Sequence, residues 1–172
     1  THVSADSASW IREVVTKRCP QAVQCADPFH VVKWANQALG TVRTTTWREA
    51  RAQGATRKNG REQGRQRRDS VGAARELAHA RYCLWKNPEN LTDRQQQRLR
   101  WIAQTHPVLW EAYRLKEGLR LLFQMRGRPA IKAFHDWLTW ARSSPVHEFT
   151  HLAERITAIR KTIVATLIHG LS

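Results

Sequence analysis

Two short apolar runs near the start of the chain, each ending on an aspartate, place the strongest constraint on the fold. Val3–Ala5 leads to Asp6, and Ala22–Ala26 leads to Asp27. Each run is too short for a helix and is typical of a buried strand, and Pro20 marks a turn before the second run. The pattern predicts a strand–helix–strand unit in which both carboxylates lie at neighbouring strand ends.

Two carboxylates at the same edge of a sheet suggest that the chain binds a divalent metal ion there. Ligands of open α/β sheets usually bind at the strand ends, and acidic oxygens suit hard divalent ions such as Mg²⁺. Asp6 and Asp27 are therefore candidates for a metal-dependent phosphoryl-transfer site. Asp27 also has a structural interpretation, because an aspartate followed by Pro28 is a strong helix start with the carboxylate as N-cap. The two interpretations are compatible, and both place His30 on the first turn of that helix.

Helical periodicity dominates the rest of the sequence. Thr92 and Gln95 have the spacing of a capping box, and the apolar stripe from Phe149 to Leu167 predicts one continuous last helix that begins at Ser144. The predicted helices begin at or near residues 7, 28, 74, 92, 107, 131 and 144. The predicted fold class is mainly α, with a short βαβ unit followed by helices.

A basic, glycine-containing stretch interrupts the helices at residues 54–73. It has almost no apolar side chain with which to bury a face, so it is typical of a flexible linker. Its basic residues are Arg57, Lys58, Arg61, Arg65, Arg67 and Arg68. Neutralising DNA phosphates with these six would give a salt slope of about −5. A solvated hinge without DNA contacts is the alternative.

Charge and composition narrow the class of protein. The chain carries 29 Lys and Arg against 14 Asp and Glu, a formal charge of +15, which favours a nucleic acid or an anionic surface as partner. No apolar run is long enough for a membrane span, and the start has no secretory signal pattern, so we expect a cytoplasmic location without membrane association. The three cysteines have neither disulfide nor zinc spacing. Most of the eight tryptophans are expected in the core, and single ones are candidates for base stacking.

Several segments share a resemblance beyond their periodicity. They are Val3-Ser4-Ala5-Asp6, Trp10-Ile11-Arg12, Ala26-Asp27-Pro28-Phe29-His30-Val31-Val32-Lys33, Ala80–Thr92, Leu115–Arg120 and His169-Gly170-Leu171-Ser172. Together they resemble the ISL-three family of bacterial insertion-sequence transposases. The last segment is similar to the one that, in this family, runs into an Asn-Gly and then the final catalytic glutamate. The resemblance covers nearly the whole chain.

This resemblance implies a DDE transposase with an RNase H-like core, in which three carboxylates bind two divalent ions, Mg²⁺ or Mn²⁺. It aligns Asp6 with the middle, metal-binding carboxylate, with Asp27 as the alternative, and it makes Asp27 and His30 an Asp-x-x-His signature. The implied role of His30 is to hydrogen-bond a DNA phosphate or scissile-strand oxygen, or to hold the site in shape. The implied division is a partial catalytic core at 1–53, the linker at 54–73 and an α-helical insertion domain at 74–172.

The resemblance also implies that this polypeptide is catalytically incomplete, since the first aspartate and the final glutamate of the triad lie outside it. Asp136 and Glu148 are poor replacements, because each falls on the polar side of a predicted helix. No metal ion is expected to bind tightly to this polypeptide alone. Its expected partners are DNA, at element ends and target, and a second copy or a full-length transposase. The alternative is a noncatalytic basic helical module that binds DNA or inhibits a transposase.

Overall fold

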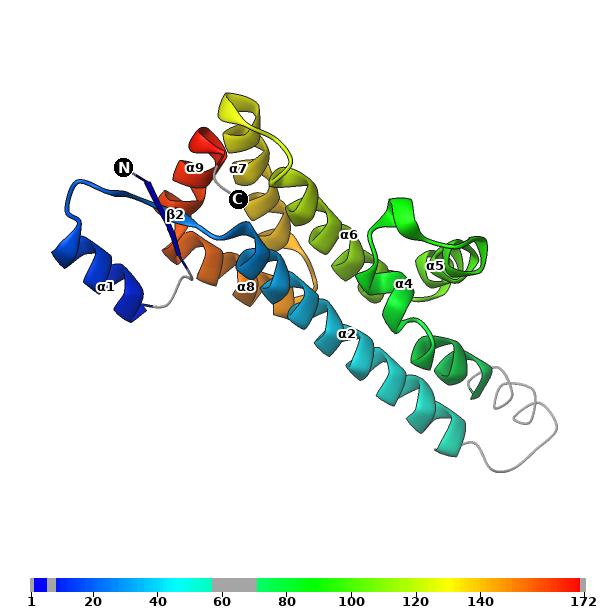
Figure 1. Ribbon diagram of the computed structural model, residues 1–172. Coiled ribbons are helices and arrows are strands. Elements are labelled where there is room, and N and C mark those ends of the chain that lie inside the picture. Colours follow the sequence, from blue (N-terminus) through cyan, green and yellow to red (C-terminus); the bar gives the residue numbers. More distant parts are fainter. Residues whose placement is uncertain (1, 6–8, 57–70, 171–172) are drawn as a thin grey trace. The chain divides into compact units, whose positions relative to one another are not determined.

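The first part of the chain forms a parallel βαβ unit that leads into a long helix. The computed structural model describes residues 2–5, 9–56 and 71–170 (Figure 1). Strand β1 (His2–Ala5), helix α1 (Ser9–Arg18) and strand β2 (Val23–Ala26) are followed by helix α2 (Pro28–Thr56). The two strands pair in parallel, with His2 opposite Val23 and Ala5 opposite Ala26. The predicted strand–helix–strand unit is therefore confirmed.

The remaining described elements are all helical. They are residues 71–78, α4 (Arg81–Trp85), the short 3₁₀ helix η1 (Pro88–Asn90), α5 (Asp93–Thr105), α6 (Pro107–Leu122), α7 (Gly127–Ser143), α8 (His147–Ala158) and α9 (Arg160–His169). The mainly α fold class is thus confirmed. None of the helices in the described ranges is long and apolar enough to cross a membrane.

Helix boundaries follow the sequence signals closely at two N-termini. Asp27 accepts a hydrogen bond from the Phe29 N–H at 2.9 Å, so it caps α2 as its sequence predicts. Thr92 and Gln95 form the complete, reciprocal capping box of α5. Both caps satisfy backbone N–H groups that have no partner within the helix.

Two predicted helices are divided in the structure. The segment predicted as one helix from residue 74 turns at residues 79–80, where α5 supplies a partner for the backbone: Arg98 Nη1 donates to the His79 carbonyl at 3.3 Å. The last predicted helix breaks at Ile159 into α8 and α9. Threonine hydroxyls flank that break, with Thr157 donating to Ala153 O and Thr162 to Ile159 O, and such bonds bend helices. The predicted apolar stripe is nevertheless buried along both helices.

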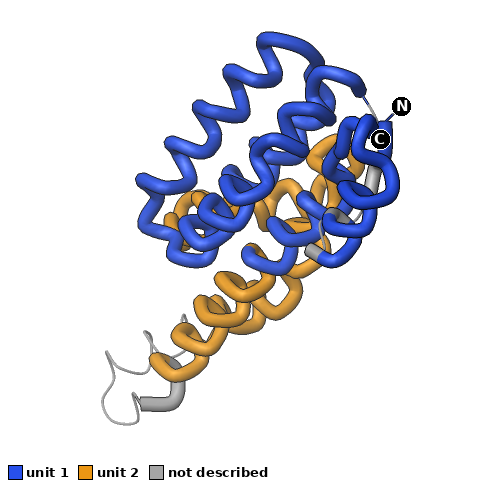
Figure 2. The backbone as a smooth tube through the Cα atoms, turned by 90° about the vertical axis from the view of Figure 1, so that its left-hand side faces the viewer, with its two compact units in different colours: residues 1–38, 114–172 blue, residues 39–113 orange. Residues whose placement is uncertain are grey.

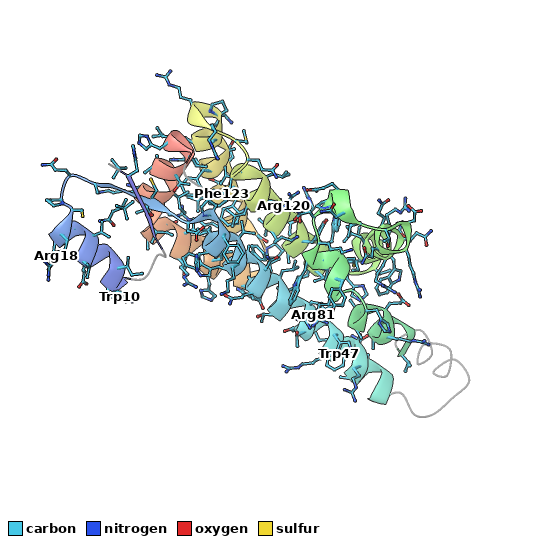
Figure 3. The ribbon with its side chains drawn as sticks, viewed as in Figure 1. Trp10, Arg18, Trp47, Arg81, Arg120 and Phe123 are labelled. Carbon is cyan, nitrogen blue, oxygen red and sulfur yellow. The ribbon has the colours of Figure 1, made fainter. Side chains whose placement is uncertain are left out.

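Helix α1 covers the sheet with a narrower face than its sequence suggests. The predicted stripe includes Trp10 and Val14, yet these side chains are 66% and 50% exposed. Ile11 and Val15 are half-buried and form the inner face. Figure 3 shows Trp10 and Arg18 near the two ends of α1.

The chain divides into two compact units (Figure 2). Unit 1 comprises residues 1–38 and 114–172, and unit 2 comprises residues 39–113. The largest fully buried apolar side chains of unit 1 are Leu115, Leu119, Phe134, Phe149, Ile156 and Ile163, and those of unit 2 are Leu39, Leu77, Leu84, Ile102 and Leu109. The helices also extend into the predicted linker, because α2 continues to Thr56 and residue 71 is already helical. Residues 57–70 lie outside the described ranges.

Unit 1 also buries a cluster of charges on α6. Lys116 is 1% exposed and forms an ion pair with Glu117, whose other carboxylate oxygen accepts a 2.7 Å hydrogen bond from Arg120. One turn of helix thus shares one carboxylate between two cations. Sharing compensates part of the large desolvation cost of burying them.

Candidate functional site: an aspartate–histidine pair at the end of a strand

Asp27 lies at the junction of β2 and α2, where its carboxylate forms hydrogen bonds with a backbone N–H and with a histidine side chain. One carboxylate oxygen, Oδ1, accepts the Phe29 N–H, and the other, Oδ2, lies 2.7 Å from His30 Nδ1. The N-cap geometry fixes the carboxylate, and the carboxylate then fixes the imidazole one turn later. Asp27 therefore acts both as the N-cap of α2 and as the partner of His30, so its two interpretations are compatible.

The pair is accessible without being fully solvated. The side chains of His30 and Asp27 are 30% and 32% exposed, and the Phe29 ring meets the imidazole edge-on at 5.6 Å. A carboxylate at Nδ1 favours the tautomer that carries a proton on that nitrogen, and it fixes the orientation of the ring so that Nε2 is left for a ligand. Such a histidine can hydrogen-bond an anionic oxygen or accept a proton from a reacting group.

The C-terminal helix supports the strand that carries this pair. Helix α9 packs against β2, and the Thr166 hydroxyl donates a 2.8 Å hydrogen bond to the Ala26 carbonyl, the last residue before Asp27. Thr166 is completely buried, and the two residues lie 140 positions apart in the sequence. Burial raises the pKa of the neighbouring Cys25 thiol, an effect that its hydrogen bond with Thr166 partly opposes. The thiol is therefore protonated at neutral pH and acts as part of the core.

The two ends of the described chain meet beside the sheet. The rings of His2 on β1 and His169 on α9 lie 4.3 Å apart. Gly170 ends α9 with a φ of +69°, and a Cβ there would lie 2.9 Å from Arg126 Nε. The left-handed backbone favours glycine at this position, and any other side chain would also have to displace the Arg126 guanidinium. The helical region therefore begins and ends at the same small sheet.

Arg155 is a cation that lies against the helix that carries His30, and the sequence did not point to it. Its guanidinium carbon lies 3.5 Å from the centroid of the Trp34 ring. Trp34 follows His30 by four residues on α2, so the two side chains share one helix face about 6 Å apart along the axis. Arg155 comes from α8, and only the tertiary fold brings it to this face. Its side chain is exposed.

The described residues do not form a complete metal site. Within residues 2–5, 9–56 and 71–170, no group of three His, Cys, Asp or Glu side chains is placed to hold a metal ion. Asp6 directly follows the last residue of β1 in the sequence and lies outside those ranges. Asp136 forms an exposed 2.7 Å ion pair with Lys132, and Glu148 is half-buried. Asp27 and His30 are thus the predicted site residues that the structure brings together.

The tryptophans lie less deeply than the sequence suggested. Trp137 is 4% exposed, and its ring N–H donates to the Leu115 carbonyl. Trp10 and Trp85 are exposed, at 66% and 40%, and the other five tryptophans are half-buried. In the described ranges, guanidinium groups lie over four of the rings: Arg51 over Trp47, Arg81 over Trp85, Arg114 over Trp140 and Arg155 over Trp34. Figure 3 labels Trp47 and Arg81 from two of these pairs. A large ring with one exposed face favours such stacking over full burial. The six basic residues predicted to contact DNA all fall in 57–70, outside the described ranges.

The fold and the site define a class: a mainly α protein whose C-terminal helix returns to a small parallel sheet, with an aspartate–histidine pair at one strand end. The whole chain, residues 1–172, matches the ISL-three (ISL3) family, which is described as "Transposase". The chain belongs to this family. The resemblance noted from its sequence motifs is therefore confirmed.

Curated relatives agree with this assignment. The transposase for insertion sequence element IS1557 of Mycobacterium tuberculosis, from two strains, is 50% identical over 178 residues, covering all of this chain and 40% of the relative. The transposase for insertion sequence element IS1001 of Bordetella parapertussis is 27% identical over 172 residues, covering 99% of this chain and 38% of the relative. The chain thus spans about 40% of the length of these relatives. No solved structure matches it significantly.

Proposed function

We propose that this chain is the interior part of a DDE transposase that moves DNA by metal-dependent phosphodiester cleavage and strand transfer. Membership of the transposase family supports the reaction class. The observation that carries the assignment of the site is the 2.7 Å contact between Asp27 and His30 directly after β2. The strand end, the capped helix and the carboxylate-oriented imidazole together suit a site that handles an anionic oxygen.

The metal chemistry belongs to the intact enzyme in this proposal. Asp6 supplies the middle carboxylate ligand of an RNase H-like core, and the other two carboxylates of the triad come from further parts of the enzyme. Bound Mg²⁺ or Mn²⁺ would activate the attacking oxygen and stabilise the leaving one. The 172-residue polypeptide alone is then inactive in cleavage.

Asp27, His30 and Arg155 act on DNA without being metal ligands. Both oxygens of Asp27 already accept hydrogen bonds, so Asp27 orients His30. His30 then hydrogen-bonds a phosphate or scissile-strand oxygen. The exposed guanidinium of Arg155, stacked on Trp34 along the same helix face, contacts the phosphate next to it.

The six basic residues between Arg57 and Arg68 bind the DNA backbone in this proposal. The partners are the element ends and the target DNA, and a second copy of the transposase joins the assembly. The protein acts in the cytoplasm. The formal charge of +15 supports an electrostatic contribution to DNA binding.

The experiment is DNA cleavage by the full-length transposase that contains this segment, with labelled element ends and Mg²⁺ or Mn²⁺. We expect His30→Ala to lower the cleavage rate at least about a hundredfold, the usual contribution of a positioned acid or base. Asp27→Asn should have a smaller effect, because an amide oxygen can still cap α2. A wild-type enzyme that cleaves no element end with either metal would refute the proposed function.

His151→Ala is the matched control. His151 lies 3.3 Å from the Glu154 carboxylate three residues later, so it is also a histidine paired with a carboxylate at a separation of three residues, but both side chains are at least 67% exposed on α8. Equal loss of activity in the two histidine variants would refute a specific role for His30. An equal rate for His30→Ala and the wild type would refute it as well.

The charge also favours a second candidate function, a noncatalytic module that binds DNA or blocks a full-length transposase by joining its assembly. The two candidates differ in one observation. A noncatalytic module would bind element ends as the isolated 172-residue chain and reduce cleavage when added to the full-length enzyme. The proposed transposase segment requires His30 for cleavage within the full-length enzyme.

A further inference from the structure

Unit 2 contains an open groove of about 1060 Å³ that has no part in the proposed catalytic site. Helical residues 71–78, α4 and α5 supply its walls, so one continuous stretch of chain forms it. Its volume is comparable to that of ligand-binding clefts in proteins. Three arginines line it together with several ring-bearing side chains, among them Tyr82, Trp101 and His106; the arginines are Arg75, Arg94 and Arg98.

The three arginines differ in how firmly they are held. Arg98 Nε donates to Glu76 at 2.9 Å, and its Nη1 donates to the His79 carbonyl at 3.3 Å. Glu76 is the acidic side chain in the lining, and its charge is matched by Arg98. The side chains of Arg75 and Arg94 are exposed, and neither guanidinium forms a hydrogen bond or ion pair within the described ranges, although the charge of Arg94 contributes to lowering the pKa of Glu76. The groove therefore has a net positive charge, with two guanidinium groups available for an anion.

The rings present flat surfaces between these charges. Trp101 is half-buried and lies 4.9 Å from the His106 ring. Burial lowers the pKa of His106 below its usual range, so its ring is neutral at pH 7. Tyr82 also lines the groove and is 65% exposed. Neutral rings offer stacking surfaces to a planar ligand.

We propose that this groove binds single-stranded DNA, with Arg75 and Arg94 on backbone phosphates and Trp101 or Tyr82 stacked on a base. A ligand that combines repeated negative charge with flat rings matches both kinds of side chain, whereas an acidic peptide matches only the arginines. Duplex DNA hides its base faces, so it loses the stacking contribution. The inference rests on the proposed function only in taking DNA as the ligand.

The test is fluorescence anisotropy of the 172-residue chain with a labelled oligodeoxythymidylate of about ten nucleotides, within the range bound by single-strand-binding folds. We expect the double variant Arg75→Gln/Arg94→Gln to weaken binding about tenfold and to reduce the salt slope by about 1.4, since each phosphate contact on a single strand contributes about 0.7. The control is Arg48→Gln/Arg100→Gln. It removes the same charge from two exposed arginines outside the lining.

A stacking readout separates the groove from general electrostatics. Oligonucleotide binding should quench tryptophan fluorescence in the wild type, and Trp101→Phe should remove most of that quenching while thermal unfolding shows that the fold is kept. Equal weakening by the two double variants would overturn the proposal. So would equal affinity for polyglutamate or for a duplex of the same length.

The proposal for the groove and the proposal for the catalytic site can be refuted independently. Loss of cleavage in the full-length His30→Ala enzyme with unchanged oligonucleotide binding concerns the catalytic site alone. Loss of specific binding in the Arg75→Gln/Arg94→Gln variant concerns the groove alone.

Discussion

The two units are built from the sequence in opposite ways. Unit 2 is one uninterrupted stretch, 39–113, whereas unit 1 joins residues 1–38 to residues 114–172. Contacts in unit 1 such as that between Thr166 and Ala26 close a separation of 140 residues. Closing a long loop costs conformational entropy that a local contact does not. The candidate catalytic pair therefore depends on a support that forms only when distant parts of the chain meet.

The interiors of the units differ as well. Unit 1 buries Lys116, Glu117 and Thr166, while the fully buried large side chains of unit 2 are all apolar. Each of these polar groups has a specific hydrogen-bond or ion-pair partner, so each contact fixes how its helix is placed within unit 1. Most of the described arginines of unit 2 are exposed, whereas Arg43 is half-buried and donates to the Leu77 carbonyl, and Arg98 is half-buried against Glu76. The comparison predicts that single polar substitutions will affect unit 1 more than unit 2.

The largest effect is expected for Glu117→Gln in unit 1. The substitution removes the negative charge shared by Lys116 and Arg120 in a buried cluster, and breaking such a cluster costs about 3 kcal/mol. Urea unfolding should report this loss as a lower free energy of unfolding. Glu154→Gln is the control, because Glu154 is 67% exposed, and it should change stability by less than about 0.5 kcal/mol. Equal costs for the two variants would contradict the importance of the buried cluster.

Glycine-to-alanine substitutions should act in opposite directions in the two units. A Cβ at Gly118 in α6 would lie 3.1 Å from Trp140 Cζ3 and 3.3 Å from Trp137 Cδ1, so overpacking should outweigh the gain in helix propensity and cost about 1–2 kcal/mol. A Cβ at Gly40 in α2 meets nothing within 4 Å, so Gly40→Ala should stabilise by up to about 1 kcal/mol. Differential scanning calorimetry measures both. If both variants changed the free energy of unfolding in the same direction, helix propensity alone or packing alone would determine the effect of the added methyl group.

Thr166→Val should loosen the support of the candidate site by about 1–2 kcal/mol. Valine keeps the volume but leaves the Ala26 carbonyl without its buried donor. The sharper measurement is thiol labelling at pH 8 in a Cys19→Ser background. Cys25 in unit 1 and Cys83 in unit 2 are both buried, and burial raises both thiol pKa values, so labelling reports local opening.

The labelling result compares the two units directly. Thr166→Val should accelerate the labelling of Cys25 and leave that of Cys83 unchanged. Thr139→Val is the control, because the exposed Thr139 hydroxyl bonds only to the His135 carbonyl of its own helix among described residues. Parallel acceleration at Cys25 and Cys83 would mean that both units open together.

The smallest effect is expected for Glu76→Gln in unit 2. The hydrogen bond from Arg98 is the main cause that holds the pKa of Glu76 below its ordinary value of 4.5. Its contribution to stability is therefore complete above pH 4.5 and disappears as the pH falls through the lower, folded-state pKa. The side chain is 47% exposed, so solvent screening limits the contribution to about 0.5 kcal/mol. Urea unfolding at pH 7 and pH 3 should show a small difference between the variant and the wild type at pH 7 and a smaller one at pH 3.

Local signals in the sequence were sufficient for much of the fold. The Asp27 cap and the Thr92–Gln95 capping box depend on residues within one turn, and their partners lie two or three positions away. The pairs Trp47–Arg51 and Arg81–Trp85 are four residues apart on helices, so their spacing also carries a readable signal. The breaks at residues 79–80 and at Ile159 were not visible in the apolar stripe, because an apolar stripe continues through a turn that keeps its side chains buried.

The sequence by itself determined the βαβ unit, the mainly helical class, the capped starts of α2 and α5 and the Asp27–His30 spacing, because each depends on neighbours along the chain. Only the tertiary structure decided that Thr166 supports β2, that Arg155 lies over Trp34 and that Arg98 joins Glu76 in the groove wall. These contacts join residues far apart in the sequence. Their partners are selected by how helices pack in three dimensions, and helical periodicity specifies which face of a helix is buried but not which helix it meets.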